Sequence, residues 1–245
     1  MCSDRFKEAC NAVIGAERSS KGIGTLGEKT LHAVLKRYYE PFEGNHEIRV
    51  GSFVADIVGE KGVIEIQTRN FNKLLRKLEC FLEYCDVTVV FPIPETKYLS
   101  WVDTETGEVT SRRKSPKKGR IYDAVKELYR IKYTLDNPMM HLCLCILDIE
   151  ETRYLNGWSK DKKRGSTRCD RVPTALVSEV RFDSPADYRS FIPAGLPESF
   201  TSKDFAKAAK ITLKIAQTTL NLLTYLGQVE RIGKQGAMIL YRTVN

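Results

Sequence analysis

The sequence predicts an α/β protein in which helices flank a mixed central sheet, followed by a small C-terminal helical module. Three observations lead to this fold class. Apolar residues recur at helical spacing over residues 4–18, 28–39 and 71–84, whereas residues 47–67 and 86–91 are rich in extended-chain formers. The resulting order of helix, strand, strand, helix, strand indicates mixed strand pairing within one sheet. The last fifty residues form a separate module, in which two helices and a hairpin are expected.

The composition is that of a globular protein. The 245 residues suffice for one sizeable core, or for a core domain with a small module, and hydrophobic and charged residues make up 42% and 29%. No apolar run approaches the roughly 20 residues of a membrane span. Residues 1–22 are too charged for a signal peptide. We therefore expect a cytoplasmic protein without a membrane partner, and its net charge of +8 favours polyanionic partners.

The seven cysteines include no Cys-x-x-Cys pair, and the three histidines show no ligand spacing. This pattern favours free thiols in a reducing compartment over a zinc site. Cys143 and Cys145 lie on one face of an apolar stretch, where buried thiols are common.

Two predicted helices, 4–18 and 28–39, enclose a glycine-containing connection. Residues 22–27 match the glycine spacing of dinucleotide-binding loops, but no strand precedes them, so no nucleotide cofactor is expected. Glu28 opens the second helix, where its carboxylate favours the helix dipole, and this alone would explain it. His32, one turn further on, can share a face with Glu28, and a structural role is its simplest interpretation.

The stretch 47–67 reads as two short strands joined by a turn at residues 59–62. Asp56 belongs to the first strand, and Glu65 shares one face of the second strand with Gln67 because side chains alternate along a strand. Carboxylates that converge between apolar walls repel each other unless a cation or proton intervenes, which is the usual starting condition of a magnesium site. The alternative is a solvated polar face.

The chain beyond the hairpin continues the α/β pattern. In the helix 71–84 the leucines point inward, and Lys73, Arg76 and Lys77 lie on or near the opposite face. The strand 86–91 is closed by Pro92 and Pro94. The remaining expected elements are a short strand at 98–102, a turn at 103–107, a helix at 121–133, a strand at 140–149, a segment at 172–182 that fits strand or helix, and a short helix capped by Ser184 that ends at Pro193.

Two loops are strongly basic, at residues 111–120 and 160–168. Each is either a solvated surface or a set of phosphate contacts. Trp158 precedes the second loop and is either a core plug or a platform for stacking.

The C-terminal module, residues 196–245, follows a linker at 193–197. Thr201 and Asp204 have the spacing of a capped helix start, Thr212 opens a second helix that stops at Gly227, and a hairpin with a turn at residues 233–236 follows. This outline is that of a winged helix, and from Leu196 onward seven Lys or Arg residues face three acids. In a DNA-binding helix-turn-helix the second helix enters the major groove. The expected DNA contacts are Lys210, Lys214, Gln217, Thr218 and Asn221, with Lys234 and Gln235 at the wing tip. A winged helix that contacts protein is the alternative.

With these residues in view, residues 20–92 resemble the core of the PD-(D/E)XK nuclease superfamily, the restriction-endonuclease-like fold. That core has a helix carrying Glu, a hairpin with Asp on one strand and (D/E)-x-K on the next, then a helix and a strand. Glu28, Asp56 and the triplet Glu65-Ile66-Gln67 occupy those places. The chain would thus comprise a nuclease-like domain, 1–195, and a winged-helix domain, 196–245.

The resemblance implies a DNA endonuclease that hydrolyses phosphodiesters with Mg²⁺ or Mn²⁺. Asp56 and Glu65 would bind the metal, with the Ile66 carbonyl as a third oxygen, and Glu28 would act through a second metal or a water. Gln67 replaces the superfamily's lysine and would position the attacking water without supplying charge. Lys73 or Lys77 could supply that charge instead.

Two other functions remain open from the sequence. The Gln67 replacement is compatible with a catalytically inactive, nuclease-like protein that binds DNA or regulates. A protein-interaction adaptor with a winged helix is the third reading. A homodimer that cuts both strands is compatible with the sequence, but no feature decides it.

Overall fold

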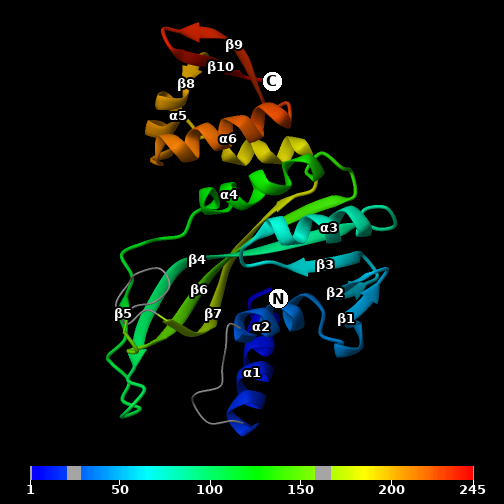
Figure 1. The fold of residues 1–245 in the computed structure, drawn as a ribbon, viewed down its shortest axis with the longest axis vertical. Helices are drawn as coiled ribbons and strands as arrows, with labels where there is room; N and C mark the ends of the chain where they lie inside the picture. The colour runs from blue at the N-terminus through cyan, green and yellow to red at the C-terminus, as the bar shows by residue number, and fades with distance from the viewer. Residues whose placement is uncertain (1, 21–28, 158–166, 245) are drawn as a thin grey trace.

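One mixed sheet organises the larger part of the molecule (Figure 1). The computed structural model describes residues 2–20, 29–157 and 167–244, and within these ranges seven strands form the sheet, in the order β1-β2-β3-β4-β6-β7 with β5 paired to β4. The strands are β1 His46–Val50, β2 Phe53–Gly59, β3 Gly62–Ile66, β4 Val87–Val102, β5 Arg113–Lys114, β6 Met140–Tyr154 and β7 Thr167–Phe182. Pairing is antiparallel from β1 to β3, parallel from β3 through β4 to β6, and antiparallel between β6 and β7. The predicted α/β class with a mixed sheet is confirmed.

Helices cover both faces of this sheet. Helices α1 (Cys2–Ser20) and α2 (Lys29–Tyr39) pack on one face against Ile66, Val90 and Leu147. The other face carries α3 (Phe71–Phe81), α4 (Val125–Leu128) and the 3₁₀ helices η2 (Ile121–Ala124), η3 (Tyr129–Thr134) and η4 (Pro185–Phe191). A short 3₁₀ turn, η1 (Glu43–Asn45), leads into β1. Among the helices of the described residues, none is long and apolar enough to cross a membrane.

The predicted two-stranded hairpin is a three-stranded meander. Gly51 adopts φ +58° in a turn that separates β1 from β2, so the extended run that we expected to be one strand folds back on itself. The turn between β2 and β3 lies where the sequence predicts it. Gly62 has φ +91°, and a Cβ there would lie 2.2 Å from the Asp86 carbonyl oxygen, so the turn requires glycine.

The prediction that Pro92 and Pro94 end the fourth strand is wrong, because β4 continues through both to Val102. The Gln67 N–H donates to the Val90 carbonyl (2.9 Å), so Val90 faces β3. Pro92 and Pro94 face the same side as Val90. They lie beyond the last residue of β3, so no hydrogen bond between the two strands requires the N–H group that proline lacks. The expected short strand at 98–102 is the second half of the same strand.

Other expectations have mixed outcomes. The single helix expected at 121–133 is three short pieces, and Ile131 inside η3 has a non-helical φ of −115°. The ambiguous segment 172–182 is strand, and Cys143 and Cys145 are buried as expected. Glu28, Trp158 and most of the second basic loop lie outside the described residues.

The C-terminal segment forms a second, smaller layer. It consists of β8 (Phe200–Thr201), α5 (Ser202–Ala209), α6 (Leu213–Tyr225), β9 (Val229–Gln235) and β10 (Met238–Thr243), and its strands pair in the order β8-β10-β9. Thr201 caps α5 as predicted, since its Oγ1 accepts from the Asp204 N–H (3.4 Å). The Thr212 side chain likewise accepts from the Ile215 N–H at the start of α6.

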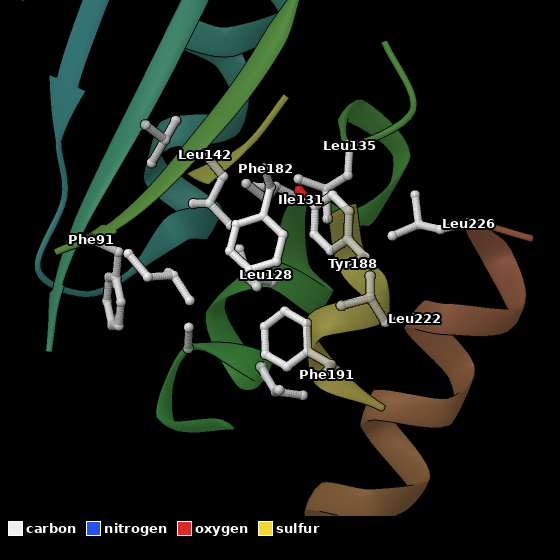
Figure 2. Packing of buried hydrophobic residues seen from close by; sticks show 14 of the residues in the cluster. Phe91, Leu128, Ile131, Leu135, Leu142, Phe182, Tyr188, Phe191, Leu222 and Leu226 are labelled. Carbon is white, nitrogen blue, oxygen red and sulfur yellow. The ribbon is translucent and has the colours of Figure 1, made fainter. Parts of the chain in front are cut away.

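One apolar core joins this segment to the large sheet. Figure 2 shows Leu222 of α6 and Leu226, the C-cap of that helix, facing Phe191 and Tyr188 of η4, with Leu128 of α4 beside them. All five side chains are at most 5% exposed. Helix α6 lies beside α4 (Figure 1), and buried apolar contacts hold it against α4 and η4, which fixes its orientation relative to the sheet.

Candidate functional site

Asp56 and Glu65 meet where the β2–β3 ladder ends. The last paired residues there are Ile57 and Ile64, and the two acids come next on each strand. The Ile66 N–H donates to Asp56 Oδ2 (2.8 Å), and the Asp56 N–H donates to Glu65 Oε1 (3.2 Å). Each carboxylate thus binds the backbone of the opposite strand, which holds the two side chains next to each other.

Lys77 brings a positive charge to this pair from the middle of α3. Its Nζ donates to Glu65 Oε1 (2.9 Å) and Oε2 (2.8 Å). The Glu65 side chain is only 2% exposed, whereas that of Lys77 is 24% exposed. Leu74 and Leu78 bury the inner face of α3, and Lys77 lies at the margin of that face, so its side chain reaches the sheet. Lys73 and Arg76 are exposed, as the sequence predicts.

His32 reaches the same site from the opposite face of the sheet. It lies on α2, and its Nε2 is 3.1 Å from Asp56 Oδ2. Both side chains are partly exposed, at 32% and 20%. The site therefore lies between α2 and α3 and is open to solvent on the Asp56 side.

The two carboxyl groups have pKa values shifted in opposite directions. Burial raises the pKa of Glu65 above its ordinary value, and the negative charge of Asp56 raises it further, against the opposing effect of Lys77. Burial would also raise the pKa of Asp56, but its hydrogen bonds with His32 and the Ile66 N–H outweigh burial, and the pKa is lowered. Two carboxylates thus share this site with the ammonium group of Lys77, an arrangement that attracts a further cation.

The other predicted catalytic and metal-binding residues have different environments. Gln67 follows the pair along β3, but its Nε2 donates to the Arg69 carbonyl (2.5 Å). Ile66 is buried at the end of β3, beside Asp56. Glu28 lies outside the described residues.

Most of the predicted DNA-contact residues are accessible. Lys210, Lys214, Gln217, Lys234 and Gln235 are exposed. The half-buried Thr218 donates its hydroxyl to the Lys214 carbonyl (2.9 Å). Asn221 is also half-buried, and its Oδ1 accepts from Lys132 Nζ (3.4 Å), so it contributes to the contact between α6 and η3.

The sequence alone provided little indication that His32 and Lys77 contact the carboxylate pair. It favoured a structural role for His32 and treated Lys77 as one of two candidate cations on an outer face. The signal for Lys77 was its place three residues after Leu74 and one before Leu78, at the edge of the apolar stripe of α3. His32 had no comparable signal, because only the packing of α2 against the sheet brings it to Asp56.

The fold and the site define an α/β protein with a paired carboxylate centre at the end of a β-meander. Residues 29–183 match a family described as a domain of unknown function (DUF8091), and the chain belongs to this family. An uncharacterized protein of Treponema pallidum (strain Nichols) is 27% identical over 221 residues, which cover 90% of this chain and 87% of that protein. No solved structure matches the chain. The matched family segment contains Asp56, Glu65 and Lys77, and it ends before β8.

Proposed function

We propose that this protein is a metal-dependent DNA endonuclease, which hydrolyses phosphodiester bonds with Mg²⁺ or Mn²⁺. The observation that carries the proposal is the pairing of Asp56 and Glu65 at the end of β2 and β3, with Lys77 bound to Glu65. An acid pair with one ammonium group is suited to holding a divalent cation next to a phosphate.

The order of elements supports the same proposal. Helix α2, the meander β1-β2-β3, helix α3 and the parallel strand β4 follow the order of the restriction-endonuclease-like core, and the acids stand on the two strands that this core uses. The finer assignment of the sheet to that fold is part of the proposal.

The donor set fits magnesium. Within the described ranges, no group of three or more His, Cys, Asp or Glu side chains forms a complete ligand set. Magnesium in phosphoryl-transfer sites commonly takes only one or two carboxylates and completes its shell with water and phosphate oxygens. Asp56 and Glu65, with the Ile66 carbonyl, would hold the ion, which when bound supplies an activated water and neutralises phosphate charge.

Within this proposal Lys77 takes the role of the lysine that Gln67 replaces. Its ammonium group is the one that contacts the carboxylate pair, and it can offset charge on the scissile phosphate. The Gln67 amide contacts a backbone carbonyl instead. His32 holds Asp56 through Nε2 and thereby orients the carboxylate. The role of Glu28 rests on the resemblance alone.

The C-terminal segment would bind DNA as a winged helix. Its order β8, α5, α6, β9, β10 is the helix, helix, hairpin order of that domain class. Lys214 and Gln217 on α6 and Lys234 and Gln235 on the hairpin are exposed and able to contact phosphates or bases.

A catalytically inactive DNA-binding protein is the second candidate. The observation that favours it is Gln67, which has no charge and whose amide donates to Arg69. Under this candidate the carboxylate pair and Lys77 would be a structural ion-pair cluster.

The test is cleavage of supercoiled plasmid and branched DNA with Mg²⁺ or Mn²⁺. We expect metal-dependent cleavage by the natural protein and none by Asp56→Ala or Glu65→Ala. Glu60→Ala, in the exposed turn between the same strands, is the matched control and should cut normally. The nuclease proposal fails if the natural protein cuts no DNA form with any metal, or if Asp56→Ala cuts normally. DNA binding that needs no metal and survives Asp56→Ala, without cleavage, favours the second candidate.

A further inference from the structure

A basic groove lies between the large sheet and the C-terminal segment. Its volume is about 700 Å³. One wall is formed by β4 and the segment that leads into η2 and α4, and the other by the end of α5 and the first turn of α6.

The groove is lined mainly by basic residues, of which Lys97 and Arg171 also pair with the buried Glu151. Its lining includes seven basic residues and one acid, Asp123. The basic residues are Lys97, Lys117, Lys118, Arg120, Lys126, Arg171 and Lys210. The exposed pairs made by Lys117 with Asp123 (3.4 Å) and by Lys118 with Glu95 (3.8 Å) are long and weak in water. Such a concave, basic surface attracts a polyanion.

Two further lysines, one from each wall, are available for an anion. Lys126 and Lys210 are exposed, and among the described residues neither lies within 4.0 Å of a carboxylate oxygen. The lining is also partly apolar, with Pro92 and Ile93 on β4 and Ile211 between α5 and α6. A groove with basic and apolar side chains suits a sugar-phosphate chain better than a free inorganic anion.

The two walls are joined by hydrogen bonds. Arg120 donates from Nη2 to the Ala209 carbonyl (2.7 Å) and from Nη1 to the Lys210 carbonyl (3.2 Å). Lys210 itself adopts a left-handed conformation, φ +52°, as the C-cap of α5. The end of α5 is therefore fixed relative to η2, and the groove is a built feature of both parts of the chain.

The groove lining includes a residue that closely follows Glu65 in sequence. Thr68 lines it, directly after Gln67 and three residues after Glu65. The lining also includes Thr212, the N-cap of α6, and Ile215 in the first turn of that helix. A chain lying in the groove would thus run between Thr68, three residues after Glu65, and the start of α6.

We propose that this groove binds one sugar-phosphate backbone of DNA and leads it from the Asp56–Glu65 site to the N-terminal end of α6. The inference rests on the proposed function for its choice of DNA, and it adds that the binding surface is composite. The main domain contributes Lys118 and Lys126 to it, and the C-terminal segment contributes Lys210.

Binding of a fluorescein-labelled 30-base-pair duplex in EDTA, measured over a range of salt concentrations, tests the inference without requiring cleavage. For Lys118→Glu/Lys126→Glu we expect about 10-fold weaker binding or more, and a log–log salt slope smaller by about 2, since each lost phosphate contact removes about 0.9. Lys210→Glu alone should lower the slope by about 1. Lys7→Glu/Lys61→Glu, two exposed lysines outside the groove, has the same net charge as the first variant and should keep the natural slope.

The outcomes separate the two proposals. Equal weakening by the groove pair and the control pair overturns the groove. Weakening by Lys210→Glu without any weakening by the groove pair also overturns it, because binding would then belong to the C-terminal segment alone. Normal cleavage together with unchanged binding by the groove pair overturns the inference and leaves the nuclease proposal intact. Groove-dependent binding by a protein that never cuts DNA supports the groove and removes the nuclease. Thermal melting of each variant confirms that the exposed substitutions leave the fold intact.

Discussion

Two buried glutamates in this molecule have opposite surroundings. Glu65 is 1% exposed and shares its site with a second acid, and Lys77 is its cationic partner. Glu151 is fully buried and is surrounded by cations from three neighbouring strands. These are Arg153 (Nε–Oε1 2.7 Å), Arg171 (Nε–Oε2 3.3 Å), Arg168 (Nε–Oε2 3.4 Å) and Lys97 (Nζ–Oε2 3.5 Å).

The pKa values follow these surroundings. Burial and the charge of Asp56 raise the pKa of Glu65. Burial would also raise the pKa of Glu151, but the charges of Lys97 and the nearby arginines outweigh it, and the pKa is lowered. A buried acid with abundant cations has its charge compensated and serves the fold. A buried acid with too few cations attracts another one, which is the physical basis for our proposal that a metal binds at Asp56 and Glu65.

The largest expected effect is on the free energy of unfolding, at Glu151 and the cations around it, which we call the cation-rich site. Glu151→Ala leaves several buried or half-buried cations without their shared carboxylate, so the free energy of unfolding should fall by about 3–5 kcal/mol. Urea denaturation measures this loss. Glu150→Ala is the matched control, because Glu150 is the adjacent residue and has a 44% exposed side chain, whose ion-pair partner among the described residues is the exposed Arg112. Its loss should be about 1 kcal/mol or less. Equal losses in the two variants would remove the structural role that we assign to Glu151.

The next effect is on DNA cleavage, at Asp56 and Glu65, which we call the acid-rich site. Lys77→Ala should lower metal-dependent cleavage about 10- to 100-fold, as is typical when a group that supports metal ligands is removed. Lys73→Ala, on the exposed face of the same helix, should cleave at the natural rate. Lys77→Arg keeps the charge and should recover part of the activity. If Lys77→Ala cleaves as fast as Lys73→Ala, the lysine contributes only to the fold.

The smallest effect is a difference in pH dependence, measured as unfolding free energy in EDTA. The raised pKa of Glu65 means that the folded state binds its proton more tightly than the unfolded state does. The contribution of Glu65 to the free energy of unfolding therefore declines as pH rises above 4.5. The lowered pKa of Glu151 means that this residue contributes to the free energy of unfolding above pH 4.5, and that the contribution is lost as pH falls through the folded-state pKa. Relative to the natural protein, Glu65→Gln should therefore gain stability with rising pH, whereas Glu151→Gln should lose it. Parallel trends in the two variants would contradict the contrast between the sites.

The acid pair itself could be predicted from the sequence, because strand alternation and a short turn place Asp56 and Glu65 on adjacent strands whatever the rest of the fold. The turn at Gly51 and the continuation of β4 through Pro92 could not be predicted. The first depends on a left-handed glycine inside an extended run, and the second on β3 ending before the prolines. The cations around Glu151 come from segments far apart in sequence, so their meeting depends on the β6–β7 register, which no local pattern encodes.

The central claim is that the acid-rich site binds a divalent cation and the cation-rich site does not. Crystals soaked in Mn²⁺ test it directly through an anomalous difference map. We expect a peak between the carboxylates of Asp56 and Glu65, its loss in Asp56→Ala crystals, and no peak at Glu151. A map without density between Asp56 and Glu65 at saturating Mn²⁺, with Lys77 still bound to Glu65, would contradict the account.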